Sequence, residues 1–143
     1  MSETTVLLVD DEEEFVTVLA ERLERRGLTV DTAPSGEIAL DKAGDHAFDA
    51  IVLDMAMPGM DGVQTLRRLL EINKDIQVIL LTGHSTLQQA VEAMKLGALD
   101  LLEKPAEIEM LVARIDDAAR RKTKMDDRRI EKRISDIMRQ KGW

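Results

Sequence analysis

Short apolar runs alternate along the chain with longer segments whose apolar residues recur at helical spacing. The runs are rich in Val, Ile and Leu and span four or five residues each, which is typical of buried strands. We expect five strands, at residues 6–9, 29–32, 50–53, 78–81 and a last one that ends near residue 103. Strands that alternate with helices are typical of βαβ units, so the pattern predicts an α/β fold with a parallel sheet.

Residues that favour helix ends bound the segments between these strands. Gly27, Gly44 and Gly97 each follow a stretch of helical spacing, whereas Pro34-Ser35 and Gly62 each precede one. We therefore expect helices at residues 13–26, 35–44, 62–73 and 86–95, and a fifth that begins after Pro105. The face of the first helix expected to pack on the sheet consists of Phe15, Val18, Leu19 and Leu23. The fourth helix has a thinner apolar face, which predicts looser packing, and it consists of Leu87, Val91 and Met94.

The segment after Pro105 allows two interpretations. It contains neither Gly nor Pro from Ala106 to Lys141, so nothing in the backbone chemistry forces a break. Its apolar stripe is nevertheless interrupted at residues 120–124, where Thr123 is able to cap a second helix. One long helix and two consecutive helices both fit this pattern.

Composition narrows the class of protein. A chain of 143 residues with two Phe, one Trp and no Tyr is long enough for one domain, whose core must come from aliphatic side chains. The absence of Cys excludes disulfides and thiolate metal sites. No apolar run approaches the roughly 20 residues of a membrane span, and the polar N-terminus lacks a signal pattern. We expect a soluble cytoplasmic protein without membrane contacts.

The net charge of −8 is unevenly distributed. Residues 1–105 carry 9 Lys/Arg against 20 Asp/Glu, a balance of −11, whereas residues 106–143 carry 11 against 8, a balance of +3. An acidic body repels a phosphate backbone, which argues against direct nucleic-acid binding. The mildly basic tail is typical of a solvated helix face.

Polar side chains stand at the carboxyl ends of four predicted strands. Asp10 and Asp11 follow the first, Asp54 the third, Thr82 the fourth and Lys104 the last. Open α/β sheets place their chemistry at this edge. Three carboxylates, a hydroxyl and an ammonium group together predict a phosphoryl-transfer site.

Each of these groups has a distinct expected role. Asp54 is the candidate nucleophile, which would form an aspartyl phosphate. Asp10 and Asp11 add negative charge, so the site requires a cation, and oxygen ligands without His or Cys favour Mg²⁺ (or Mn²⁺). Lys104 offers a positive charge to a phosphoryl oxygen. We expect no conventional enzyme, but a protein that catalyses its own phosphorylation and dephosphorylation.

Four motifs, at residues 8–11, 53–62, 81–84 and 97–105, resemble those of the receiver domain of two-component response regulators. The resemblance covers about residues 5–121. It implies a flavodoxin-like, doubly wound (βα)5 fold with five parallel strands in the order 2-1-3-4-5 and a C-terminal helical extension. We expect a receiver domain at residues 1–121 and a charged amphipathic helical tail at residues 122–143.

The resemblance also implies roles for individual residues. The backbone carbonyl of Ala56 would join Asp10, Asp11 and Asp54 as a metal ligand. The bond between Lys104 and Pro105 is expected to be cis. Thr82 would act as the switch, moving toward the phosphoryl group and repacking the surface of the fourth helix and last strand.

Two further positions bear on that switch surface. His84 is two residues beyond Thr82, a position that in the family borders the phosphoryl site and affects dephosphorylation. Leu101 occupies a position where family members usually carry Tyr or Phe, so the usual aromatic coupling to the threonine is absent. We expect Thr82 to act mainly through the backbone and the fourth helix.

The resulting function is that of a signalling switch. Asp54 would accept a phosphoryl group from a sensor histidine kinase or a phosphotransfer protein, and the altered surface would engage a protein target or a second copy of the chain. The 38 residues after Pro105 have room for the last helix and one more, so we expect no output domain in this chain. Two alternatives stay open: the receiver portion of a transcription regulator, since residues 81–84 resemble the nitrogen-regulator class, and a phosphorelay or phosphate-sink receiver.

Overall fold

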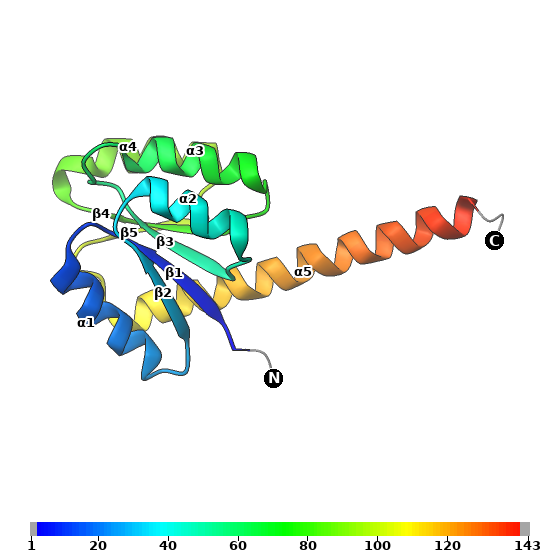
Figure 1. Ribbon diagram of the computed structural model, residues 1–143, viewed down its shortest axis with the longest axis horizontal. Helices are drawn as coiled ribbons and strands as arrows, with labels where there is room; N and C mark the ends of the chain where they lie inside the picture. Colours follow the sequence, from blue (N-terminus) through cyan, green and yellow to red (C-terminus); the bar gives the residue numbers. More distant parts are fainter. Residues whose placement is uncertain (1–2, 141–143) are drawn as a thin grey trace.

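A parallel sheet of five strands forms the centre of the computed structural model, which describes residues 3–140 (Figure 1). The strand order is β2-β1-β3-β4-β5, as the resemblance implied. The strands are β1 (Thr5–Val9), β2 (Thr29–Ala33), β3 (Ala50–Asp54), β4 (Val78–Thr82) and β5 (Asp100–Glu103). The predicted flavodoxin-like α/β fold is confirmed.

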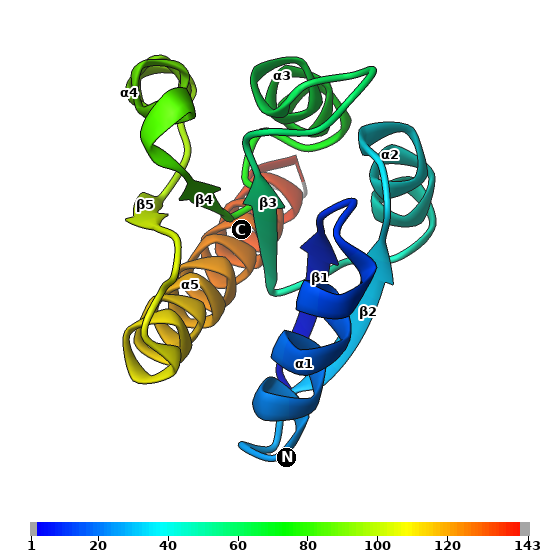
Figure 2. The same ribbon diagram turned by 90° about the vertical axis from the view of Figure 1, so that its left-hand side faces the viewer.

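Helices cover both faces of this sheet. They are α1 (Glu13–Glu24), α2 (Gly36–Asp45), α3 (Gly62–Ile72), α4 (Leu87–Leu96) and α5 (Ile108–Gln140), with a short 3₁₀ turn η1 (His84–Thr86) before α4. Figure 2 shows α2, α3 and α4 on one face and α1 and α5 on the other. The structure is therefore a three-layer, doubly wound sandwich.

Alternate residues of each central strand supply the two halves of the core. In β1, Leu7 and Val9 face α2–α4, whereas Val6 and Leu8 face α1 and α5. All four side chains are almost completely buried. Strands buried on both faces are nearly continuous in apolar residues, which explains why these runs stood out in the sequence.

Side-chain caps fix the starts of two helices on the α2–α4 face. The Ser35 hydroxyl accepts a hydrogen bond from the Ile38 amide at 3.2 Å, and Asp61 accepts one from the Gln64 amide at 2.9 Å. Such caps satisfy amides that lack a partner within the helix. Asp61, which follows the loop after Asp54, is thus a helix cap.

Two predicted helix faces were wrong in part. On α1, Val18 is 51% exposed and Val16 is buried against the sheet instead. On α4, Leu87 and Val91 are exposed, and the buried residues are Ala90 and Ala93. Small side chains form the buried face of α4, so large apolar residues were a misleading guide to it.

The last helix is continuous over 33 residues, so the two-helix alternative is wrong. Leu111, Ile115 and Ala118 pack on the sheet, and the helix then runs on beyond the body (Figure 1). The Thr123 hydroxyl donates to the Ala119 carbonyl at 3.1 Å, within the same helix, instead of capping a new one. Residues 141–143 of the predicted tail lie outside the described residues.

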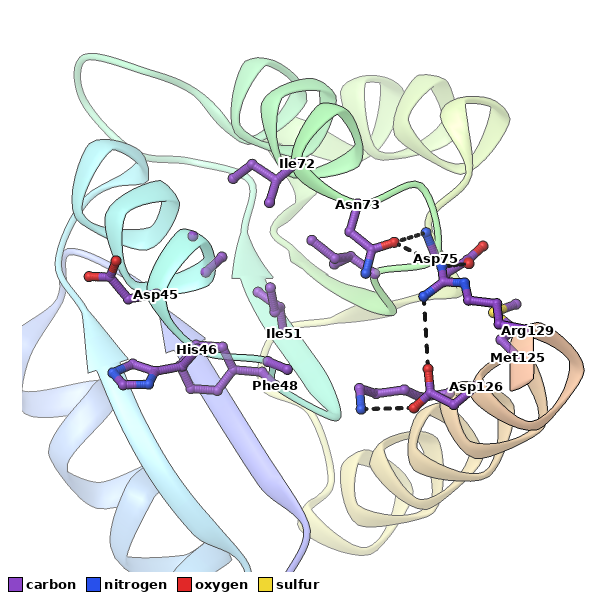
Figure 3. Close-up of a pocket in the computed structure, with 15 residues that line it drawn as sticks. Asp45, His46, Phe48, Ile51, Ile72, Asn73, Asp75, Met125, Asp126 and Arg129 are labelled. Carbon is purple, nitrogen blue, oxygen red and sulfur yellow. Dashed lines mark hydrogen bonds and ion pairs between the residues drawn. The ribbon is translucent and has the colours of Figure 1, made fainter. Parts of the chain in front are cut away.

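Polar contacts hold the first part of this extension against the body. Arg129 pairs with Asp75 and donates to the Asn73 side chain at 3.2 Å (Figure 3). Lys122 lies 3.8 Å from Asp49. A cavity of about 300 Å³ lies between the extension and the loops that precede β3 and β4. Beyond Arg129 the apolar side chains are exposed, and they are Ile130, Ile134, Ile137 and Met138. Over the described range, no helix combines the length and apolarity needed to cross a membrane.

Candidate functional site

Three of the predicted site residues meet at the carboxyl edge of the sheet. Asp54 ends β3 and Asp10 directly follows β1, and both side chains are buried. Lys104 follows β5, and its Nζ lies 2.9 Å from Asp10 Oδ2 and 3.4 Å from Asp54 Oδ1. The cluster follows from topology, because β1 and β3 are neighbours and parallel strands end at the same edge.

Glu12 is a member of this cluster that the sequence did not single out. Oxygens of the Asp10, Glu12 and Asp54 carboxylates lie within 4.8 Å of one another. The Glu12 amide donates to Asp10 Oδ1 at 3.0 Å, which turns the chain back on itself before α1. Asp11, predicted as a metal ligand, is exposed and is not part of this group. Residues 10–14 are all acidic, so the sequence alone does not tell which of them reach the site. The backbone turn between Asp10 and Glu12 decides it.

The Asp54 carboxylate is incompletely satisfied. Its Oδ1 accepts the Ala56 amide at 3.2 Å, whereas its Oδ2 is buried without a hydrogen-bond partner in the described part of the chain. Burial, followed by the negative charge of Asp10, raises the pKa of Asp54 to about 6. An unpaired buried carboxylate oxygen is costly, and its presence indicates a site built for a cation or a reacting group.

Lys104 partly neutralises the cluster. Burial alone would lower the pKa of its ammonium group, but the hydrogen bond to Asp10 and the charges of Asp10, Asp54 and Glu12 outweigh burial and raise it. The ammonium also lies 4.5 Å from the centre of the Phe15 ring, a cation–π contact. Lys104 is therefore fully charged at neutral pH. The Lys104–Pro105 peptide bond is cis, as predicted.

Thr82 is at the same edge, and its hydroxyl is hydrogen-bonded within the turn that leads into α4. It ends β4 and is completely buried. Its hydroxyl donates to the Gly83 carbonyl at 3.0 Å and lies 2.6 Å from the Thr86 hydroxyl. Among the described residues, its side-chain hydrogen bonds all lie within the turn at residues 82–86. From the sequence, Thr86 was predicted only as the start of the fourth helix. Its hydroxyl, four residues after that of Thr82, was the signal that the two side chains could form a hydrogen bond.

The other predicted positions lie around this centre. Ala56 is exposed and contributes the amide bond to Asp54. His84 is exposed on η1, and Leu101 is half-buried against the core on the α2–α4 face. Pro105 is exposed and lines a shallow cavity with Phe15 at the α1–α5 side. None of the site residues lines the cavity beside the α5 extension, which Figure 3 shows.

Comparison with known proteins identifies the family. A family model described as the response regulator receiver domain matches residues 6–116. The chain belongs to this family. The match covers nearly the whole sheet, α1 to α4, the acidic cluster and the first turns of α5, so the receiver fold and its place in two-component systems are established. The boundary between receiver and tail, placed at residue 121, stays a prediction.

Named relatives agree with this assignment. The receiver is 38% identical over 128 residues to the uncharacterized transcriptional regulatory protein YkoG of Bacillus subtilis, covering 89% of this chain and 56% of the relative. It is 40% identical over 119 residues to the transcriptional regulatory protein FixJ of Rhizobium meliloti, covering 83% and 58%. The chain therefore spans about half the length of these curated relatives.

A solved structure has the same fold. The crystal structure of a response regulator receiver domain protein from Clostridium thermocellum is 34% identical, with a TM-score of 0.81, and the match covers 85% of this chain and 98% of that one. That structure is a receiver domain of nearly the same extent as the globular body here.

The acidic cluster fits a divalent cation. Receiver domains generally bind Mg²⁺, a hard cation that takes carboxylate and carbonyl oxygens as ligands. Here the fit rests on Asp54 Oδ2, which is buried and unpaired, and on the neighbouring oxygens of Asp10 and Glu12. When bound, the ion would supply positive charge against the carboxylates and an incoming phosphoryl group.

Proposed function

We propose that this receiver is a phosphorylation-dependent switch whose acceptor is Asp54. The observation that carries the proposal is the buried, unpaired Oδ2 of Asp54 beside the Lys104 ammonium at the carboxyl edge of the sheet. A pKa of about 6 leaves Asp54 mostly ionised at neutral pH and thus nucleophilic. Its basicity also exceeds that of an ordinary aspartate.

The proposed reaction needs little from the protein beyond position and charge. An Asp54 oxygen attacks the phosphorus of a phosphohistidine, the P–N bond breaks and the imidazole leaves with the electron pair. The product is an aspartyl phosphate. Lys104 is placed to balance charge on the phosphoryl oxygens, which is the main requirement of phosphoryl transfer. The donor would be a sensor histidine kinase or a phosphotransfer protein.

Metal binding in this proposal uses Asp10, Asp54 and the Ala56 carbonyl, the last by family resemblance. Glu12 is the additional acidic group that the geometry brings near. Asp11 would contribute only after a local rearrangement, because its carboxylate is not part of the group of oxygens formed by Asp10, Glu12 and Asp54. Comparison of Mg²⁺ affinity in Asp11→Asn and Glu12→Gln decides which of the two carboxylates takes part.

Labelling with acetyl phosphate in the presence of Mg²⁺ tests the acceptor. The wild-type chain should gain one phosphoryl group that is stable in acid and labile in base, and Asp54→Asn should gain none. Asp61→Asn is the matched control, since it removes a neighbouring exposed carboxylate and retains a residue able to cap α3. Labelling of Asp54→Asn at the wild-type level would remove Asp54 as the acceptor.

A second candidate function follows from the relatives. YkoG and FixJ are named transcriptional regulatory proteins and are about twice as long as the matched region. The chain would then be the receiver portion of such a regulator, with α5 as the link to an output domain. Light scattering with and without Mg²⁺ and beryllofluoride, a mimic of the phosphoryl group, separates the two. Dimerisation on adduct formation supports kinship with transcription regulators, and a monomer in both states supports docking on another protein.

A further inference from the structure

In the turn between β4 and α4, hydrogen bonds join Thr82, Gly83 and Thr86 in a small network. The Gly83 amide donates to the Thr86 hydroxyl at 3.1 Å, and the Thr86 and Thr82 hydroxyl oxygens are 2.6 Å apart. The Thr82 hydroxyl donates to the Gly83 carbonyl at 3.0 Å. The Thr86 hydroxyl also lies 3.3 Å from the Gly83 carbonyl, so it is able to donate either to that oxygen or to Thr82. At 2.6 Å, the contact with Thr82 is the shorter of the two, and when Thr86 donates there each hydroxyl gives one hydrogen and accepts one. Hydrogen bonds in such chains strengthen one another.

This arrangement opposes the movement that the proposed function requires of Thr82. To reach a phosphoryl oxygen on Asp54, the Thr82 hydroxyl must leave both the Gly83 carbonyl and the Thr86 hydroxyl. Thr82 is completely buried, so these bonds are not simply replaced by water during the movement. Buried hydrogen bonds that are broken without replacement cost free energy.

We propose that Thr86 is a positioning residue that holds the Thr82 hydroxyl away from the phosphoryl site in the unphosphorylated protein. It acts as a latch, and its partner is the switch residue itself. This inference rests on the proposed role of Thr82. It adds that the resting state is favoured by a specific side-chain contact on the turn leading into α4.

Removal of the latch should make the active conformation easier to reach. Thr86→Val keeps the shape of the side chain but lacks the hydroxyl. We expect it to lower the concentration of beryllofluoride needed for half-saturation by about fivefold, the factor that a typical net hydrogen-bond free energy represents. In two-dimensional NMR, amide signals of α4 in the unliganded variant should move toward their positions in the beryllofluoride-bound wild type.

Thr86 also accepts the Gly83 amide, so a purely structural role needs its own control. Loss of that bond would weaken the turn whether or not Thr82 carries a hydroxyl. The latch predicts instead that Thr86→Val has no effect on beryllofluoride binding in a Thr82→Ala background. An equal effect in both backgrounds would overturn the latch, because the two side chains would then act independently.

Two further variants sharpen the experiment. Thr86→Ser retains the hydroxyl and should behave like wild type. Ser85→Ala removes an exposed neighbouring hydroxyl that has no hydrogen bond among residues 3–140, and it should leave binding unchanged. If the wild type itself takes up no beryllofluoride, the proposed function of Asp54 fails. If the wild type binds it and Thr86→Val binds it equally well, only the latch fails.

Discussion

The proposed phosphoacceptor, Asp54, lies in surroundings that oppose its ionisation in the folded protein. The side chain is 2% exposed and close to Asp10, and one of its oxygens has no partner in the described residues. Its raised pKa means that the folded state holds the proton more tightly than the unfolded chain does. Ionisation of Asp54 therefore destabilises the metal-free protein, and the charge that makes the residue reactive is the source of that cost.

The pH dependence of stability should reveal this cost. Between about pH 4 and pH 6 the folded protein binds more protons at Asp54 than the unfolded chain, so the stability contributed by this group falls as the pH rises. Asp54→Asn lacks that dependence. The free energy of unfolding of the variant, relative to wild type, should increase by roughly 2–3 kcal/mol from pH 4 to pH 7.5. Urea unfolding in metal-free buffer at both pH values measures it, and a difference that does not change with pH would contradict the assignment.

Single residues differed in how far the sequence could predict them. Asp10, Asp54 and Lys104 were predictable because each stands at the end of an apolar strand, and the sheet topology brings strand ends together. Glu12 was not, because its approach depends on the backbone turn that its own amide makes with Asp10. Thr86 was missed since its partner, Thr82, is contacted only when the turn into α4 has folded.

At the scale of elements, the start of α3 packs directly against the residue that follows β3. Gly62 begins α3 and is buried against Met55, the residue after Asp54. A Cβ at Gly62 would lie 2.8 Å from the Met55 Cα and 2.7 Å from its Sδ. Backbone cannot yield as a flexible side chain can, so the helix start and the strand end constrain each other.

Gly62→Ala should therefore destabilise the receiver. Overpacking of this kind costs about 1–3 kcal/mol. Gly44→Ala is the matched control, because Gly44 is also in a helix but a Cβ there meets nothing within 4 Å. That variant should be unchanged or up to about 1 kcal/mol more stable, as Ala favours helix over Gly. Urea unfolding at pH 7.5 compares the two, and a Gly62→Ala protein as stable as wild type would refute the close contact.

The positions of the strands were predicted well from the sequence, whereas the buried face of α4 and the continuity of α5 were not. Strands buried on both faces are apolar throughout, so their positions were evident. The inner face of α4 was not, because Ala90 and Ala93 carry little hydrophobic signal although both are completely buried. For α5 the sequence permitted a break near Thr123, and contacts far away in the chain, from Arg129 to Asp75 and Asn73, accompany the continuous helix.

At the scale of the whole molecule, charge and the proposed function are separated along the chain. The acidic residues 1–105 contain the proposed phosphoryl site, whereas α5 lies within the mildly basic segment 106–143. The site is at the carboxyl edge of the sheet, and α5 leaves the body near the opposite edge (Figure 1). Under the proposed function, a signal from Asp54 that reached the extension would therefore have to cross the domain.

Mg²⁺ should stabilise this acidic molecule through the site rather than through its overall charge. A ligand at about 100 times its Kd adds about 2.7 kcal/mol to the free energy of unfolding. For a chain of this length, that corresponds to roughly 5–10 °C in Tm. NaCl at the same ionic strength only screens charges, so it should give a smaller increase that is equal in wild type and Asp54→Asn. Because Asp54→Asn removes one of the cluster carboxylates, most of the additional increase with Mg²⁺ should disappear in that variant. Thermal unfolding of both proteins in the two salts measures the difference, and an equal response to Mg²⁺ would place the stabilising ion elsewhere on the acidic surface.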